Sequence, residues 1–516
     1  MQDSGSPRPT VLSVLQDHLR GDRQWARLAG HVPPFALTQL RTSLACRSGE
    51  LGGREMRCGA CGTEVLRPNS CHLRACSLCG IPRREQWKGQ VIGWSLECDH
   101  LHVVFTLPHE LNRLMFEPSG EHGERNRVQL FRQLCQSGIA VLQRVAEREY
   151  GCRVGLIATL HTWGQQMNRH VHLHVIMTAG GLSLEDGRWV PIGESDRAMQ
   201  PAVLAEQFRR SYLRRLSSKL KRGQLAWPGD GGVLMEPAKT LSPAAQELFA
   251  EVQAKGWMVD VQGTPEKYRG ARGVVNYLSA YVSGAAISNG RIEADDGQHV
   301  TIRFKDYRRG CKDTIKLPGT EFVRRYCDHI LPHGVYRVRY AGLFSGKGRE
   351  ERLNTCRAAL RDYERAAGIR PVPRLAEPEQ APAGNGPDTG PWGAHAGNTC
   401  RKCQGRLQET DRIDRDLMPR LMALRDGLLE RLERLERRVP AALETFILLT
   451  HAMLAHQDPR TFGFVLRGKE LRYAKLLLEE ALDRRATREE GQREKAGEPA
   501  EQAQPPPPAA LEDAWL

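Results

Sequence analysis

The sequence predicts an α+β protein with a central antiparallel sheet and flanking helices. Between residues 100 and 340, short apolar runs with strand character alternate with longer segments whose apolar residues have helical spacing. Two of the runs, residues 154–160 and 170–177, are joined by a short connection that contains Gly164, which makes them antiparallel neighbours. The 516 residues, of which 40% are hydrophobic and 26% charged, are enough for about two to four domains.

The chain is expected to begin with a helical segment over residues 1–45, because Leu12, Leu15 and Leu19 follow steps of three and four. Residues 46–85 are rich in cysteine, glycine and arginine but lack apolar periodicity, so bound metal is expected to hold this segment together. A metal-binding module that also binds DNA is therefore expected over residues 46–98. The main domain is expected over residues 99–365. Its strands are predicted at residues 102–107, 154–160, 170–177, 299–305, 313–317 and 335–340, and its helices at residues 126–149, 199–222 and 273–287.

The C-terminal part is predicted to contain a Pro/Gly linker (366–403), a helical region (404–483) and a disordered tail (484–516). Within the helical region, a leucine stripe over residues 411–438 favours helix packing, either inside the chain or as self-association between chains. The longest apolar run is too short to cross a bilayer, and the N-terminus has no secretory signal. We therefore expect an intracellular protein without a membrane partner.

The net charge of +14 favours a polyanionic partner, with nucleic acid ahead of an anionic membrane surface. The predicted helix at 199–222 is a candidate contact for the DNA backbone because it concentrates cations, namely Arg209, Arg210, Arg214, Arg215, Lys219, Lys221 and Arg222. The bland alternative is a solvated helix face. Further candidates, with the same alternative, are Arg324, Arg325, Arg337 and Arg339.

Fourteen cysteines in an intracellular protein indicate metal binding more than disulfides. Two Cys-x2-Cys pairs, Cys58/Cys61 and Cys76/Cys79, are separated by 14 residues, a spacing that predicts a tetrahedral structural zinc site. Between the pairs, Cys71 and His72 are alternative ligands. A third pair, Cys400 and Cys403, stands alone in the sequence and is interpreted either as half of a site completed elsewhere or as no site.

The predicted strand at 170–177 begins with three histidines, His170, His172 and His174, at alternate positions. Side chains at alternate positions of a strand share one face, so three imidazoles, which are common metal ligands, line one side. In the predicted helix at 273–287, Tyr277 and Tyr281 are four residues apart and share a helix face. Aromatic packing is the bland interpretation of this pair; the functional one is a pair of nucleophiles that attack a metal-activated phosphodiester.

These motifs occur in a consistent order within residues 10–360, and together they are specific. The stretches that carry the comparison are residues 46–79, 102–109, 160–165, 170–174, 179–182, 277–281, 286–289, 304–307, 321–325 and 329–332. They resemble those of the two-tyrosine rolling-circle transposases of the insertion-sequence-91 family, in the HUH (His-hydrophobic-His) endonuclease superfamily. The chain departs from the family pattern at Val171 (usually Pro), at Arg54 (commonly His) and in residues 282–285, which lack basic side chains.

The resemblance implies an HUH-type antiparallel sheet, a zinc-binding N-terminal module, His172 and His174 as a pair of ligands for Mg²⁺ or Mn²⁺, and Tyr277 and Tyr281 as nucleophiles. The implied reaction cleaves and rejoins single-stranded DNA through a 5′-phosphotyrosine with a free 3′-OH. A third ligand is needed, and His161 on the neighbouring strand is preferred to Gln165 and His170. The histidines and the tyrosine hydroxyls are then expected to converge on one phosphate-sized space.

The implied partners are single-stranded DNA at the ends of a mobile element and its target DNA, in the bacterial cytoplasm at the nucleoid. Two other functions remain open. One is a plasmid replication initiator or relaxase with the same chemistry, and the other is a catalytically inactive, zinc-dependent DNA-binding regulator.

Overall fold

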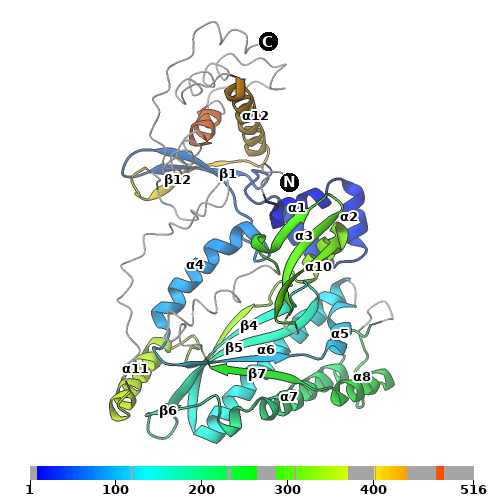
Figure 1. The fold of residues 1–516 in the computed structure, drawn as a ribbon, viewed down its shortest axis with the longest axis vertical. Coiled ribbons are helices and arrows are strands. Elements are labelled where there is room, and N and C mark those ends of the chain that lie inside the picture. Colours follow the sequence, from blue (N-terminus) through cyan, green and yellow to red (C-terminus); the bar gives the residue numbers. More distant parts are fainter. Residues whose placement is uncertain are drawn as a thin grey trace. The chain divides into compact units, whose positions relative to one another are not determined.

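The structure is a computed structural model that describes residues 8–117, 120–228, 234–263, 286–306, 309–369, 400, 402–438 and 472–481. The chain divides into two compact units, each assembled from segments that are distant in sequence (Figure 1). The first unit combines Met1–Leu44 with Leu73–Gln380, and the second combines Ala45–His72 with Ala381–Leu516. The N-terminal quarter of the sequence therefore contributes to both units.

A six-stranded antiparallel sheet is the centre of the first unit, which confirms the predicted α+β class. The strand order is β11-β4-β5-β3-β7, with β6 paired to β5. As predicted, β4 and β5 are antiparallel neighbours. The strands are β3 (His100–Thr106), β4 (Cys152–Trp163), β5 (Arg169–Ser183), β6 (Trp189–Pro191), β7 (Met258–Gly263) and β11 (Val338–Gly342).

Helices cover one face of this sheet along its length (Figure 1). The alternating side chains Val103, Phe105, Leu173 and Val175 all point to this face and are buried against the helices. Each such buried side chain stabilises the fold by roughly 1.5–3 kcal/mol. The covering helices are α5 (Asn112–Phe116), α6 (Gly120–Tyr150), α7 (Pro201–Lys221), which begins with proline at its first position, and α8 (Pro243–Ala254).

On the opposite face of the sheet, the described side chains are apolar at one end and histidines further along. At one end, Ile157 of β4 and Ile176 of β5 pack with residues of α4 (Ser77–Trp94) and α11 (Arg349–Ala366) in a second apolar cluster. Two residues further along β5, the same face carries His174 and then His172. The change from isoleucine to histidine marks where the apolar cover ends and a polar site begins.

A smaller three-stranded sheet, of order β10-β9-β8, packs with the N-terminal helices elsewhere in the first unit. Within the helical segment predicted over residues 1–45, the described residues form three helices. The side chain of Thr10 caps the first of them by accepting from the Ser13 N–H at 3.1 Å. These elements are α1 (Val11–His18), α2 (Asp22–Ala29), α3 (Pro34–Leu44), β8 (Ile292–Asp295), β9 (His299–Asp306), β10 (Cys311–Pro318) and α10 (Gly319–Asp328).

The second unit is built on a sheet that joins distant parts of the sequence. Strand β1 (Gly53–Cys58) pairs with β2 (Glu64–Pro68) on one side and with β12 (Leu407–Ile413) on the other, both antiparallel. Helix α12 (Leu417–Arg438) follows, and residues 472–481 form another helix. Part of the cysteine-rich segment 46–98 is thus an ordinary β-hairpin.

The predicted helix start at residue 411 is wrong, because Asp411–Ile413 belong to β12. Backbone pairing of these residues with β1 outweighs their local helical pattern. The helix begins at Leu417, where the Asp414 carboxylate accepts from the Leu417 N–H and so ends the preceding strand segment. The described start of the leucine stripe is buried within the chain, at Leu421 and Leu424. Self-association through the rest of the stripe stays a prediction.

Several predicted features lie outside the described residues: the tyrosine helix up to residue 285 with Tyr277 and Tyr281, most of the Pro/Gly linker, and the tail at 484–516. Among the helices that the structure describes, none combines the length and the apolar character needed to span a membrane.

Candidate metal centre and cysteine cluster

Three histidines meet on the face of the central sheet opposite to α7. The ladder of β4 and β5 pairs His161 directly with His172, and it pairs Thr159 with His174 two residues away on the same face. One ring nitrogen from each of His161, His172 and His174 lies within 4.8 Å of the others. All three side chains are buried or nearly so. The structure thus brings together the predicted ligand pair and the preferred third candidate.

The hydrogen bonds of His172 fix the orientation of its ring. Its Nδ1 lies 2.9 Å from the carbonyl oxygen of His170, which can only accept, so Nδ1 carries the proton and Nε2 carries the lone pair. Burial lowers the pKa of His172 to about 4 and the pKa of His174 well below its usual value. Both rings are therefore neutral at physiological pH, which is the form that binds metal.

A fourth histidine, His102 of β3, contacts one member of this group, His174. Its Nε2 lies 2.9 Å from His174 Nδ1, and the two rings stack with centroids 5.1 Å apart. The register explains the contact, because His102 pairs with Ile176 and is the diagonal neighbour of His174. Burial lowers the pKa of His102 to about 4, so its ring is neutral and able to accept a hydrogen bond from His174. Because Nδ1 of His174 makes this contact, Nε2 is the nitrogen through which His174 would bind a metal.

The other two candidates for the third ligand, Gln165 and His170, are exposed. The ring of His170 lies 4.9 Å from that of His172, centroid to centroid. Neither Gln165 nor His170 belongs to the group of three. The Trp163 ring stacks on the His161 ring, with centroids 4.4 Å apart. The Arg337 guanidinium lies over the Trp163 ring, 5.2 Å from its centroid. An aromatic and cationic wall therefore adjoins the histidines.

A cavity of about 350 Å³ opens beside the first residues of β5. At its base the Asp328 carboxylate is buried and pairs with Arg169 at 2.9 Å and with Arg324 at 2.8 Å. Because Arg324 and Arg325 also pair with Glu321, these two sequence-predicted cations have structural partners. The lining consists of His109, Glu110, Asn112, Arg113, Glu117, Met167, Asn168, Arg169, Arg324, Arg325 and Asp328.

The cations of α7 lie on the helix-covered side of the sheet, opposite the histidines, because α7 packs on Phe105 and Leu173. Two of them, Arg209 and Arg210, pair with Glu206, and Lys219 donates to Gln129 at 2.6 Å. Arg214 and Arg222 are exposed. Burial and the nearby charges of Arg214, Arg148 and Arg215 lower the pKa of Arg144 on α6, so like charges gather where α6 and α7 meet.

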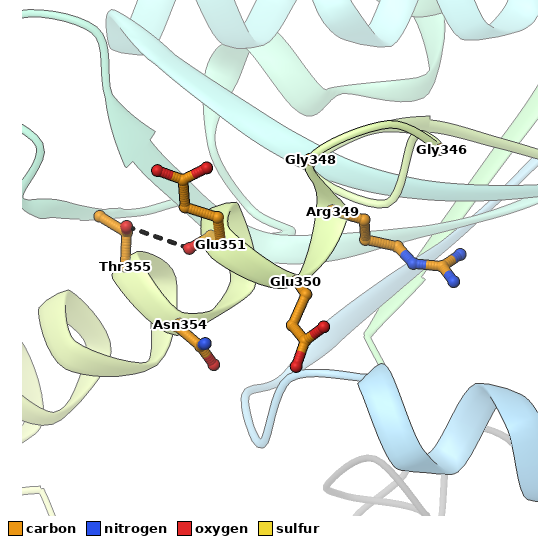
Figure 2. Close-up of a pocket in the computed structure, with 7 residues that line it drawn as sticks. All are labelled: Gly346, Gly348, Arg349, Glu350, Glu351, Asn354 and Thr355. Carbon is orange, nitrogen blue, oxygen red and sulfur yellow. Dashed lines mark hydrogen bonds between the residues drawn. The ribbon is translucent and has the colours of Figure 1, made fainter.

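Another hollow, of about 760 Å³, lies at the start of α11 (Figure 2). In Figure 2 the carboxylates of Glu350 and Glu351 point away from each other, and Thr355 donates to the Glu351 carbonyl at 3.2 Å. Its side chains therefore do not converge on a common centre as the histidines do. The lining residues are Gly346, Gly348, Arg349, Glu350, Glu351, Asn354 and Thr355.

The second unit contains a group of four cysteines, Cys58, Cys61, Cys400 and Cys403, whose sulfur atoms lie within 4.8 Å of one another. Cys58 and Cys61 lie at the tip of the β1–β2 hairpin, and the structure completes their group with the pair that stands alone in the sequence. The predicted partners Cys76 and Cys79 belong to the first unit, at the N-cap and in the first turn of α4. The alternative ligand Cys71 donates its N–H to Cys46 Sγ at 3.4 Å.

Known proteins match the chain across both the histidine strands and the cysteine segment. A family model described as "Putative transposase" matches residues 155–352, and one described as "Transposase zinc-binding domain" matches residues 15–107. The chain is similar to a Sinorhizobium fredii protein named "Putative transposase y4qJ", with 32% identity over 61% of this chain and 76% of the relative.

The chain belongs to the insertion-sequence-91 family of transposases. A further relative of this transposase is the "Transposase for insertion sequence element IS801" of Pseudomonas savastanoi pv. phaseolicola, 27% identical over 67% of the chain and 78% of the relative. No solved structure matches the chain.

The sequence did not indicate that His102 lies beside the proposed metal ligands of this transposase, although His102 belongs to the segment 102–109 that carries the resemblance. The signal that finds it is the register of β3 on β5, which places it diagonal to His174. The partnership of Cys400 and Cys403 with Cys58 and Cys61 had no sequence signal beyond the repeated Cys-x2-Cys spacing.

Proposed function

We propose that this transposase cleaves and rejoins single-stranded DNA at the ends of its element through a 5′-phosphotyrosine, in metal-dependent rolling-circle transposition. The observation that carries the proposal is the convergence of His161, His172 and His174 on one face of the sheet. Family membership makes DNA the substrate, and the neutral, oriented imidazoles supply a site for a divalent cation beside it.

The three imidazoles fit a divalent metal because their nitrogens are close together, and because His172 is hydrogen-bonded to the His170 carbonyl and His174 to the His102 ring. Mg²⁺ or Mn²⁺ prefers oxygen, so water and phosphate oxygens are proposed to complete the coordination that His161, His172 and His174 begin. When bound, such an ion offsets the negative charge that develops on the scissile phosphate.

The proposed nucleophiles are Tyr277 and Tyr281. The phenol oxygen of one tyrosine attacks phosphorus, the bond from phosphorus to the 3′ oxygen breaks, and the released 3′ oxygen takes up a proton to balance the one lost from the phenol. The product is a 5′-phosphotyrosine and a free 3′-OH. A second tyrosine allows one DNA end to stay covalently bound while another strand is cleaved.

The proposed contact to the DNA backbone is the cluster of cations where α6 and α7 meet. Arg144, Arg148, Arg214 and Arg215 repel one another, and binding of a polyanion relieves this repulsion. Since α7 lies across the sheet from the histidines, we propose that it binds DNA outside the segment that is cleaved.

The test incubates the full chain with labelled single-stranded oligonucleotides taken from the ends of its element. We expect a covalent protein–DNA adduct that requires Mg²⁺ or Mn²⁺, that is lost in His172→Ala, and that persists in the control His333→Ala, which changes an exposed histidine of the first unit. An adduct formed by the double variant Tyr277→Phe/Tyr281→Phe contradicts the proposal.

The same experiment separates the alternatives. Cleavage that prefers plasmid origins to element ends indicates a replication initiator or relaxase. Binding of the oligonucleotides without any cleavage by the unmodified protein indicates a DNA-binding regulator.

A further inference from the structure

We propose that Cys58, Cys61, Cys400 and Cys403 bind one zinc ion, which fastens the β1–β2 hairpin to a segment more than three hundred residues later. The zinc-binding family model ends at residue 107, so two of the four ligands lie outside it. The pairs in closest contact, Cys61 with Cys400 and Cys58 with Cys403, are 339 and 345 residues apart in sequence.

The two Cys-x2-Cys turns have the same backbone construction. In the first, the Cys58 N–H donates to the Thr63 carbonyl at 2.9 Å and the Gly62 N–H donates to the Cys58 carbonyl at 3.0 Å. In the second, the Cys400 N–H donates to the Gly405 carbonyl at 2.7 Å and the Gln404 N–H donates to the Cys400 carbonyl at 2.9 Å.

The residue directly after the second cysteine of each turn has left-handed backbone, with φ of 71° at Gly62 and 61° at Gln404. Glycine adopts this conformation without strain, whereas glutamine does so at a cost. An ordinary surface turn can avoid this strain, whereas a turn that must direct two thiols toward one point requires this backbone conformation. The matched turns therefore have the form of paired zinc knuckles.

The sulfur distances fit a tetrahedral ion. The Cys58–Cys403 and Cys61–Cys400 sulfur pairs are 3.5 Å apart, and all four atoms lie within 4.8 Å of one another. Four ligands at the usual zinc–sulfur bond length have sulfur atoms about 3.8 Å apart. A disulfide needs about 2.05 Å, so the thiols are unbonded and close enough to share an ion. A set of four thiolates favours zinc over hard cations.

Among the described residues of the second unit, few apolar side chains pack with these cysteines. The apolar side chains around the site are Met56, Leu407 and the half-buried Val65, which join Cys58 and Cys400 in a cluster too small to stabilise a fold alone. Gly405 is in close contact, since a Cβ there would lie 3.1 Å from Cys58 Sγ and 3.2 Å from Cys403 Sγ. Packing around the thiols is thus tight, and a metal supplies the missing stabilisation.

Ion pairs position the rest of the unit independently of the metal. Arg472 pairs with Glu55 and Glu64, each at 2.6 Å, and the Tyr473 hydroxyl donates to Glu55 at 3.0 Å and lies 2.9 Å from Asp411. Because these contacts connect the C-terminal helix to β1, β2 and β12, loss of the zinc is expected to loosen the cysteine end without separating the sheet.

The first test alkylates the full-length protein as purified, with iodoacetamide, and reads each cysteine by mass spectrometry. Cys61, Cys403 and the internal control Cys311 are all exposed. We expect Cys311 to react while Cys61 and Cys403 are protected at least tenfold, and a strong chelator to make them reactive together. Reaction of Cys403 at the rate of Cys311 before chelation overturns the proposal.

The second test measures metal content and thiol protection in full-length variants. Cys400→Ser/Cys403→Ser is expected to contain one zinc fewer per chain and to expose Cys61 to alkylation, whereas Cys311→Ser and Cys76→Ser/Cys79→Ser leave Cys61 protected. Loss of Cys61 protection in the Cys76/Cys79 variant, together with its retention in the Cys400/Cys403 variant, overturns the proposal. Iron in place of zinc in the unmodified protein also overturns it.

Discussion

His102 offers a sharp test of how the sheet orients the proposed metal ligands. In His102→Leu, the acceptor 2.9 Å from His174 Nδ1 is replaced by an apolar group, so a buried N–H loses a hydrogen bond. Such a loss costs about 1–3 kcal/mol and frees His174 to place its proton on Nε2, the nitrogen that faces the metal. At about 1.4 kcal/mol per tenfold change, we expect Mn²⁺ affinity to fall by about tenfold to a hundredfold.

The assay is a Mn²⁺ titration followed by electron paramagnetic resonance on full-length protein, with thermal unfolding as a check on folding. The matched variant is His102→Gln, whose side-chain oxygen retains an acceptor and should restore most of the affinity. The reasoning is refuted if His102→Leu binds Mn²⁺ as tightly as the unmodified protein, or if the glutamine variant is weakened as much as the leucine variant.

Three further predictions concern stability and DNA binding. Gly342→Ala should lower the free energy of unfolding by at least about 2 kcal/mol more than Gly187→Ala in urea titrations. Both glycines have positive φ, but only at Gly342 would a Cβ overlap with the Val154 carbonyl oxygen, and equal losses contradict this reasoning. Arg214→Glu/Arg222→Glu should weaken binding of single-stranded DNA and lower its salt slope by about 1.4, without changing Mn²⁺ affinity; an unchanged slope argues against the α7 contact. Burial lowers the pKa of His329 to about 4, so its contribution to stability is complete above about pH 6.5 and falls by about 3 kcal/mol toward pH 4, since the unfolded chain takes up the proton first. His329→Gln should flatten this pH dependence of unfolding relative to the exposed-site control His333→Gln, and parallel curves would contradict the assignment.

Local patterns predicted most of the first unit. The strands at 154–160 and 170–177 were predictable as an antiparallel pair because their apolar residues alternate and their connection is short. The structure confirms this pairing. Residues 411–413 misled the prediction, since their helical pattern is local whereas their pairing with β1 is not. Strand pairing across three hundred and fifty residues leaves no periodic trace in either segment.

The site residues also divide into those that local patterns predicted and those that depend on pairing between distant segments. Alternation along one strand predicted that His172 and His174 share a face, and adjacency of strands predicted that His161 is near them. The sulfur atoms of Cys58 and Cys61 lie close to those of Cys400 and Cys403, a grouping that spacing along the sequence does not reveal. The histidine that supports His174 needed the register of a third strand, which no single-sequence pattern encodes.

The pairing of β1 with β12 also has a consequence for synthesis of the chain. A ribosome that adds about 5–20 residues per second needs roughly 20–70 s after completing the first hairpin before its third strand emerges. During that interval the hairpin lacks the partner strand at one edge, and Cys58 and Cys61 lack the two cysteines that lie beside them in the finished structure. Premature termination between residues 343 and 400 would leave the first unit's central sheet encoded but this module unfinished, so only products that extend through β12 can assemble it.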